Sequence, residues 1–123
     1  MLNTSLWVVQ GFVAVVVTLA GGVKLTVPRE ALASKMHWVI SWPRWRIKLL
    51  GLAEVAGAAG LLVPQATGIA PLLTPVAAAC LAVLMGGAVA THWRLGEAPA
   101  APAIVGALCV GIAAGRLLLT AQV

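Results

Sequence analysis

Glu54 is the residue whose type and position most strongly suggest chemistry in this sequence. It lies about seven residues inside an apolar stretch that begins near Ile47, which corresponds to roughly 10 Å along an α-helix. In a helix that crosses a bilayer, a carboxyl group at this depth is costly unless it is protonated, paired or hydrated, and such residues often mark functional sites. A hydrogen bond that only joins two helices is the structural alternative.

Lys24 and His92 end two other apolar stretches, the first and the third. In a chain that crosses a membrane four times, these two ends lie on the side from which the second stretch begins. Gly21, one turn before Lys24, leaves room for close approach of a ligand or a neighbouring helix. We therefore predict a polar pocket in one half of the bilayer, formed by Lys24, Glu54 and His92 with Gly21 beside them.

The side chains of this predicted pocket suit proton transfer or ligand binding. An imidazole titrates near neutral pH, so His92 is a candidate catalytic group that exchanges a proton with a bound carbonyl or hydroxyl, and Glu54 is its candidate catalytic partner. The ammonium of Lys24 is a candidate to bind an anionic or quinone-type oxygen. The same trio would also serve to fix the register of the helices, and the sequence does not separate these roles.

The other residues capable of chemistry favour structural roles. His37 and His92 are the only histidines, and no spacing of His, Cys and acidic residues resembles a metal-ligand set, so we predict no metal site. Cys80 and Cys109, which form no CxxC motif, are interpreted as small packing residues. Arg116, near the far end of the last apolar stretch, is predicted to snorkel to the membrane interface.

The composition identifies the apolar stretches as membrane spans. Of the 123 residues, 62% are hydrophobic and 9% are charged, whereas a soluble domain carries about 25% charged residues. Intrinsic disorder requires the opposite composition, with low hydrophobicity and high charge. The chain is therefore predicted to be an integral membrane protein with a single transmembrane domain over residues 1–123.

Four apolar stretches are long enough for a membrane-spanning helix, which needs about 20 residues and at least about 17. They cover about residues 6–24, 47–63, 71–90 and 103–119, with a turn at about 64–70. The alternating pattern of membrane-spanning strands is absent from the sequence. We expect an all-α fold, an integral membrane four-helix bundle with an interfacial amphipathic helix between the first and second spans.

The predicted interfacial segment covers residues 28–46. Pro28 suits a helix start and Pro43 a helix stop, and the apolar residues between them recur at helical spacing: Leu32, Met36, Val39 and Ile40. Tryptophans and cations follow, and both prefer the headgroup level of a bilayer. The segment is predicted to anchor the bundle at the interface, and a lid over a site that opens to the cytoplasm is the alternative.

The net charge of +5 indicates membrane orientation and not nucleic-acid binding. Seven of the eight basic residues lie at or between the facing ends of the first two spans, or in the connection between the last two. The positive-inside rule places these charged loops in the cytoplasm and both termini outside the cell membrane. Residues 1–5 carry no charged side chain, so a cleaved signal peptide is not expected.

Small residues crowd the second span between Gly51 and Gly60, and Gly111 and Gly115 form a small-xxx-small pair in the fourth. Such residues let helices approach closely in lipid. Packing within the bundle is the predicted use of these residues, and a homo-oligomer interface is the alternative.

Several short motifs follow one another along the first three spans: Ala20–Leu25, Gly51–Gly57, Gly57–Pro64, Ala82–Met85 and Ala88–His92. In the order and spacing of these motifs the sequence resembles the DoxX-like family of small four-span membrane proteins. The resemblance implies that Lys24, Glu54 and His92 occupy the usual Lys, Glu and His positions of that family. It also implies a link to thiosulfate:quinone oxidoreduction within a membrane complex, or to oxidative-stress responses.

Three functions are compatible with the sequence. The first is a pocket that binds a lipophilic small molecule, with a quinone-like compound as candidate ligand, in a redox-linked membrane complex. The second is a membrane-embedded acid–base enzyme, a cyclase or isomerase, that acts on a terpenoid-like substrate. The third is a non-catalytic assembly or chaperone partner of another membrane protein. The sequence names neither the ligand nor the partner, and it does not decide whether the chain is an enzyme.

Overall fold

The computed structural model describes residues 2–34, 39 and 42–121. Four of the helices in this part of the chain are long and apolar enough to cross a membrane, and a fifth is short. The predicted all-α membrane fold is confirmed, and the helices run up to four residues past the predicted apolar stretches. The helices are α1 (Leu2–Thr26), α2 (Arg29–Ala33), α3 (Arg44–Thr67), α4 (Leu73–Arg94) and α5 (Ala100–Ala121).

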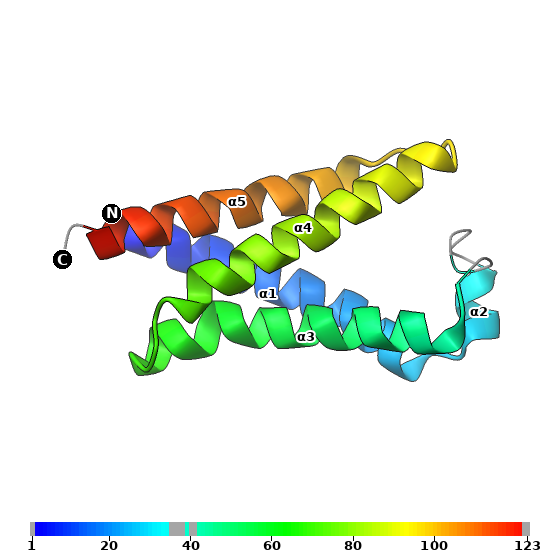
Figure 1. The fold of residues 1–123 in the computed structure, drawn as a ribbon, viewed down its shortest axis with the longest axis horizontal. Coiled ribbons are helices and arrows are strands. Elements are labelled where there is room, and N and C mark those ends of the chain that lie inside the picture. Colours follow the sequence, from blue (N-terminus) through cyan, green and yellow to red (C-terminus); the bar gives the residue numbers. More distant parts are fainter. Residues whose placement is uncertain (1, 35–38, 40–41, 122–123) are drawn as a thin grey trace.

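The four long helices pack as two antiparallel pairs, α1 with α3 and α4 with α5, and α3 also packs against α4 (Figure 1). Both chain termini lie at one end of the bundle, together with the turn from α3 to α4, and we call this the terminal end. The opposite end holds α2 and the connection from α4 to α5 (Figure 1). We call it the charged end, since its basic residues include Lys24, Arg44, Lys48 and Arg94.

The first helix illustrates why this bundle belongs in lipid. Residues three or four apart share one face of a helix, and the buried residues of α1 follow that spacing toward the other helices: Leu6, Gln10, Val13, Ala14, Val17, Gly21 and Lys24. Another face of α1 exposes a row of large apolar side chains: Val8, Phe12, Val15 and Leu19. No more than 33% of the apolar window of any span is buried inside the bundle. The remaining apolar surface therefore suits contact with lipid chains.

The core lies between the four spans and is apolar. Large side chains from every span are fully buried in it, among them Val17, Leu61, Leu81 and Ile112. Cys109 is buried in the same core, in agreement with its predicted packing role. Cys80 is exposed, so the packing role predicted for it is wrong. The reason is its position on α4, where the neighbouring Leu81 occupies the buried face.

The third helix continues through a proline at which the sequence predicted a turn. Pro64 lies inside α3, which ends at Thr67 with Gly68 as its C-cap, at φ of 73°. A proline has no N–H to donate to the carbonyl four residues earlier, here that of Gly60. The hydroxyl of Thr74 on α4 donates to this Gly60 carbonyl at 3.1 Å. The helix therefore passes Pro64 without leaving that backbone oxygen unsatisfied in an apolar environment.

The connection between α1 and α3 packs against the start of α3. Leu32, Val39 and Ile47 are buried together, with Val27 and Trp42 packed against them. This small cluster includes two residues predicted for the apolar face of the interfacial segment, Leu32 and Val39. It is separate from the main core.

The interfacial segment differs in extent from the predicted 28–46. Its described helix, α2, covers only Arg29–Ala33. Pro43 is the N-cap of α3, so residues 44–46 belong to a spanning helix. Met36, Ile40 and His37 lie outside the described residues.

Candidate functional site

Lys24 and Glu54 form an ion pair inside the bundle. The Nζ of Lys24 lies 2.9 Å from Oε1 and 3.2 Å from Oε2 of Glu54. Only 10% of the lysine side chain and 3% of the glutamate side chain are exposed. The Lys24 ammonium also contacts the Ala20 carbonyl at 3.5 Å. The two predicted residues thus meet across the α1–α3 interface, and each supplies the counter-charge that the other needs in an apolar environment.

Two glycines bring α1 and α3 close enough for this pair. A Cβ on Gly21 would lie 2.7 Å from the carbonyl oxygen of Gly51, and a Cβ on Gly51 would lie 2.8 Å from the carbonyl oxygen of Gly21. Real Cβ atoms do not approach backbone this closely, so both positions require glycine. A Cβ on Gly21 would also lie 3.1 Å from the Cβ of Glu54. The predicted Gly21 is therefore a positioning residue between two helices in this structure.

A cavity of about 330 Å³ adjoins Lys24 at the charged end. We call it the Lys24 cavity. Its walls come from the end of α1, the connection that follows, and the start of α3. The lining residues are Lys24, Thr26, Val27, Pro28, Leu32, Arg44, Ile47 and Lys48. Three cationic side chains and several apolar ones face this space, a combination that suits a lipophilic molecule bearing an electron-rich oxygen.

His92 lies in a different environment from the other predicted site residues. Its Nδ1 contacts the Glu97 carboxylate at 3.2 Å, and 27% of its side chain is exposed. In the described part of the chain, no hydrogen bond or ion pair joins His92 to Lys24 or Glu54. Figure 1 shows the end of α4 apart from the ends of α1 and α3 at the charged end. The structure thus brings together Lys24, Glu54 and Gly21, and it pairs His92 with a residue that the sequence analysis did not consider.

The pairing of His92 follows from the way α4 ends. Gly96 adopts φ of 73°, and the Glu97 N–H donates to the His92 carbonyl at 2.9 Å. A left-handed glycine followed by such a hydrogen bond is a common helix terminus. It folds Glu97 back beside the last turn of the helix. The Gly96–Glu97 dipeptide after the third span was the sequence signal for this contact.

A second buried polar cluster lies toward the terminal end and was missed by the sequence analysis. Arg116 was predicted to snorkel, but it is buried, with 3% exposure. Its Nε donates to Oε1 of Gln10 at 2.6 Å, and its Nη1 donates to Oδ1 of Asn3 at 2.7 Å. Its guanidinium lies 5.3 Å from the ring centre of Trp7, a cation–π distance. Gln10 in turn donates to the Leu61 carbonyl at 2.5 Å, so the cluster joins α1, α3 and α5.

Most of the small residues singled out in the sequence pack within the bundle. Added Cβ atoms on Gly57, Gly60 and Gly115 would lie 2.7 Å from Leu81, Ala77 and Leu6, respectively. Around Gly111 an added Cβ would meet nothing within 4 Å. Within the described residues, no group of three or more His, Cys, Asp and Glu side chains is placed to hold a metal ion.

Comparison with known proteins gives a match at the level of the family. The family model described as the DoxX-like family matches residues 8–114, a range that includes Lys24, Glu54 and His92. No curated protein and no solved structure matches the chain.

Proposed function

The chain belongs to the DoxX-like family, and from its buried ion pair and the adjoining cavity we propose that it binds a lipophilic small molecule with a quinone-like oxygen. The observation that carries this proposal is that Lys24 lines the cavity while Glu54 holds its ammonium at 2.9 Å. A cavity of about 330 Å³ falls at the small end of the range of about 300–1,000 Å³ for small-molecule sites. It suits the head of a ligand whose apolar tail lies in lipid.

In this proposal Lys24 supplies the hydrogen bond to the ligand. Lys24 lines the cavity, and its contacts with Glu54 and Ala20 hold the ammonium beside that space. A carbonyl or anionic oxygen in the cavity would accept a charge-assisted hydrogen bond, which is stronger than one between neutral groups. Glu54 acts through Lys24, because its carboxylate orients the ammonium.

We further propose that the bound ligand takes part in a redox-linked membrane complex, in which a partner protein exchanges electrons with it. Acid–base roles for Glu54 and His92 stay predictions. His92 would act separately from the ion pair, since its carboxylate partner is Glu97.

The same proposal places the charged end in the cytoplasm and both termini outside the cell membrane. The basic side chains at the charged end support this orientation through the positive-inside rule. Single cysteines introduced at Ile69 and at Ala98, both exposed, in a background without Cys80 and Cys109, would test it in intact cells. A membrane-impermeant maleimide should label the first position and not the second, and the reverse result would overturn the orientation.

Ligand binding is tested with the purified protein in mild detergent. Lipid-soluble molecules that co-purify are identified by mass spectrometry, and a short-tailed benzoquinone is titrated as a probe. We expect Lys24→Met to weaken binding about tenfold or more, as for loss of a hydrogen bond from a charged donor. Glu54→Gln should weaken it less, since it removes only the orienting carboxylate.

The exposed Arg94 of the same end provides a matched control. Arg94→Gln removes a positive charge away from the cavity and should leave the affinity unchanged. His92→Ala shows whether the imidazole also contacts the ligand. An unchanged affinity in a folded Lys24→Met protein would overturn the proposed site.

A further inference from the structure

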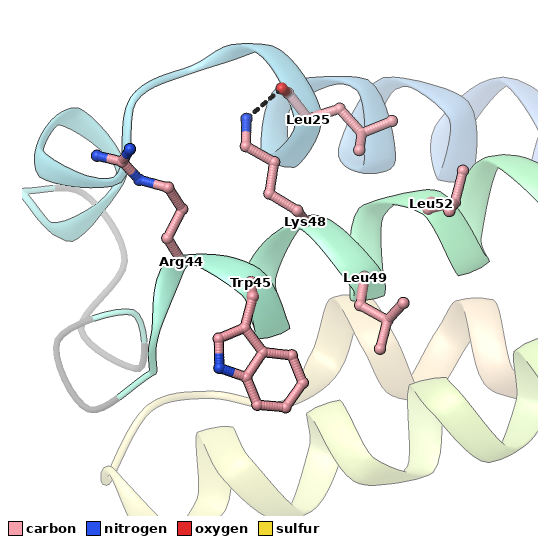
Figure 2. Close-up of a pocket in the computed structure, with 6 residues that line it drawn as sticks. All are labelled: Leu25, Arg44, Trp45, Lys48, Leu49 and Leu52. Carbon is pink, nitrogen blue, oxygen red and sulfur yellow. Dashed lines mark hydrogen bonds between the residues drawn. The ribbon is translucent and has the colours of Figure 1, made fainter.

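A groove runs along the outer face of α3 at the charged end, beside the end of α1. Its volume is about 590 Å³, and Figure 2 shows the side chains that line it. We call it the Leu49 groove. Its lining residues are Leu25 of α1 and Arg44, Trp45, Lys48, Leu49 and Leu52 of α3.

The groove has an apolar part and a cationic part. Leu49 and Leu52 are exposed by more than half, and they lie deeper along the span than the charged residues, which are at the start of α3. Arg44 and Lys48 are four residues apart, so they share one face of the helix. The resulting arrangement is a pair of cations above a strip of leucines.

The two cations are held in place without being neutralised. The Lys48 ammonium donates to the Leu25 carbonyl at 2.5 Å (Figure 2), a contact that positions the group but leaves its charge. The Arg44 guanidinium lies 3.7 Å from the Glu30 carboxylate, with 69% and 72% of the two side chains exposed. Such an exposed ion pair contributes little to stability, so another anion can replace the Glu30 carboxylate beside Arg44.

We propose that the Leu49 groove binds an anionic phospholipid. Its phosphate lies between Arg44 and Lys48, and an acyl chain follows Leu25, Leu49 and Leu52. Trp45 lines the same groove, and indole rings favour the interface of a bilayer. The Arg46 guanidinium lies 5.4 Å from the centre of the Trp45 ring. The early backbone N–H groups of the 24-residue helix α3 add to the attraction for a phosphate.

The charge and the apolar strip together select this occupant. A soluble anion would use the two cations but not the leucines, and a zwitterionic lipid would bring its own positive charge close to Arg44 and Lys48. The site differs from the Lys24 cavity, which shares Arg44 and Lys48 as wall residues but lies toward α2. The proposal therefore does not depend on a quinone-like ligand.

The test compares lipids retained by the full chain after purification. The protein is reconstituted in nanodiscs containing equal parts of phosphatidylglycerol and phosphatidylcholine, extracted gently, and analysed by native mass spectrometry. Each basic residue near an anionic surface contributes roughly a fivefold gain in affinity. We expect phosphatidylglycerol to be retained preferentially, and retention to fall about 30-fold in the double variant Arg44→Gln/Lys48→Gln.

Two further variants make the outcome decisive. Arg94→Gln removes an exposed charge of the same end outside the groove and should keep full retention. Leu49→Ala should lower retention of phosphatidylglycerol while the protein stays folded. Equal retention of the two lipids, equal loss in Arg94→Gln, or displacement of phosphatidylglycerol by millimolar inorganic phosphate would each overturn the proposal.

Discussion

Arg116 and Gln10 are separated by 106 residues in the sequence, and their side chains form a hydrogen bond of 2.6 Å inside the bundle. The glutamine is fully buried, and its amide nitrogen donates at the same time to the Leu61 carbonyl of α3. One side chain of α1 therefore links α5 to α3. This contact makes the terminal end of the bundle a polar network, whereas the middle of the bundle is held by apolar packing.

The network predicts energetic coupling between Arg116 and Gln10. Replacing either residue by Leu removes the hydrogen bond, and replacing both leaves neither partner unsatisfied. Hydrogen bonds between membrane helices contribute about 0.6 kcal/mol on average and up to about 1.7, so we expect a coupling free energy of about 1 kcal/mol. A double-mutant cycle, measured by unfolding in mixed detergent micelles, gives this value. Strictly additive effects would contradict the prediction, and Arg94→Leu serves as the control for loss of an exposed arginine.

For the Lys24–Glu54 ion pair we predict that the loss of one partner costs more stability than the loss of both. Removal of one partner of a buried ion pair costs about 3–5 kcal/mol because the other charge is left unpaired. We therefore expect Glu54→Leu to destabilise the protein strongly and the double variant Lys24→Met/Glu54→Leu to recover most of that loss. The unfolding free energies of the unmodified protein, of Glu54→Leu and of the double variant are compared in the same micelles.

The double variant also separates structure from function. If the pair serves the proposed ligand, the double variant is folded but no longer binds the benzoquinone probe. Full probe binding in that folded variant would show that the pair only fixes the register of α1 and α3.

Hydropathy and charge were sufficient to predict the spans and to place Lys24, Glu54 and His92 in one half of the bilayer. Of the three, Lys24 and Glu54 meet in the structure, where Gly21 and Gly51 let α1 and α3 approach closely. The partner of His92 was not predicted, because it depends on the left-handed turn at Gly96 that returns Glu97 to the helix. The His92–Glu97 contact depends on the local backbone conformation at Gly96 and not on the order of the spans.

The misinterpretation of Arg116 has another physical cause. The snorkelling prediction considered only the depth of the cation in the membrane. It did not consider the polar side chains that other helices place at the same depth. Gln10 lies about as far from the start of the first span as Arg116 lies from the end of the fourth. Matching polar residues by depth on adjacent spans would have paired them.

Gly21 and Gly22 provide a matched comparison at the α1–α3 interface. Gly21→Ala places a methyl group 2.7 Å from the Gly51 carbonyl oxygen, whereas a Cβ on Gly22 meets nothing within 4 Å. Overpacking of this kind costs about 1–3 kcal/mol, and an exposed Gly→Ala change in a helix gains up to about 1 kcal/mol. We expect Gly21→Ala to destabilise the fold and weaken probe binding, and Gly22→Ala to leave both intact or slightly improved. Equal effects of the two variants on unfolding would show that α1 and α3 are not in close contact at Gly21.

The hydrogen bond from Thr74 to Gly60 predicts energetic coupling between Thr74 and Pro64. This coupling requires no direct contact between the two side chains. Thr74→Val removes the donor and should cost about 1 kcal/mol, because Pro64 offers no N–H to the Gly60 carbonyl. In a Pro64→Ala background the alanine N–H supplies that hydrogen bond, so the same Thr74→Val change should cost clearly less. Thr91→Val is the control, since the Thr91 hydroxyl is bonded to Gly87 of its own helix. The measurement is the unfolding free energy of the four proteins in the Thr74–Pro64 cycle. If Thr74→Val costs as much in the Pro64→Ala background as in the unmodified protein, the Thr74 hydroxyl does not replace the hydrogen bond that the proline lacks.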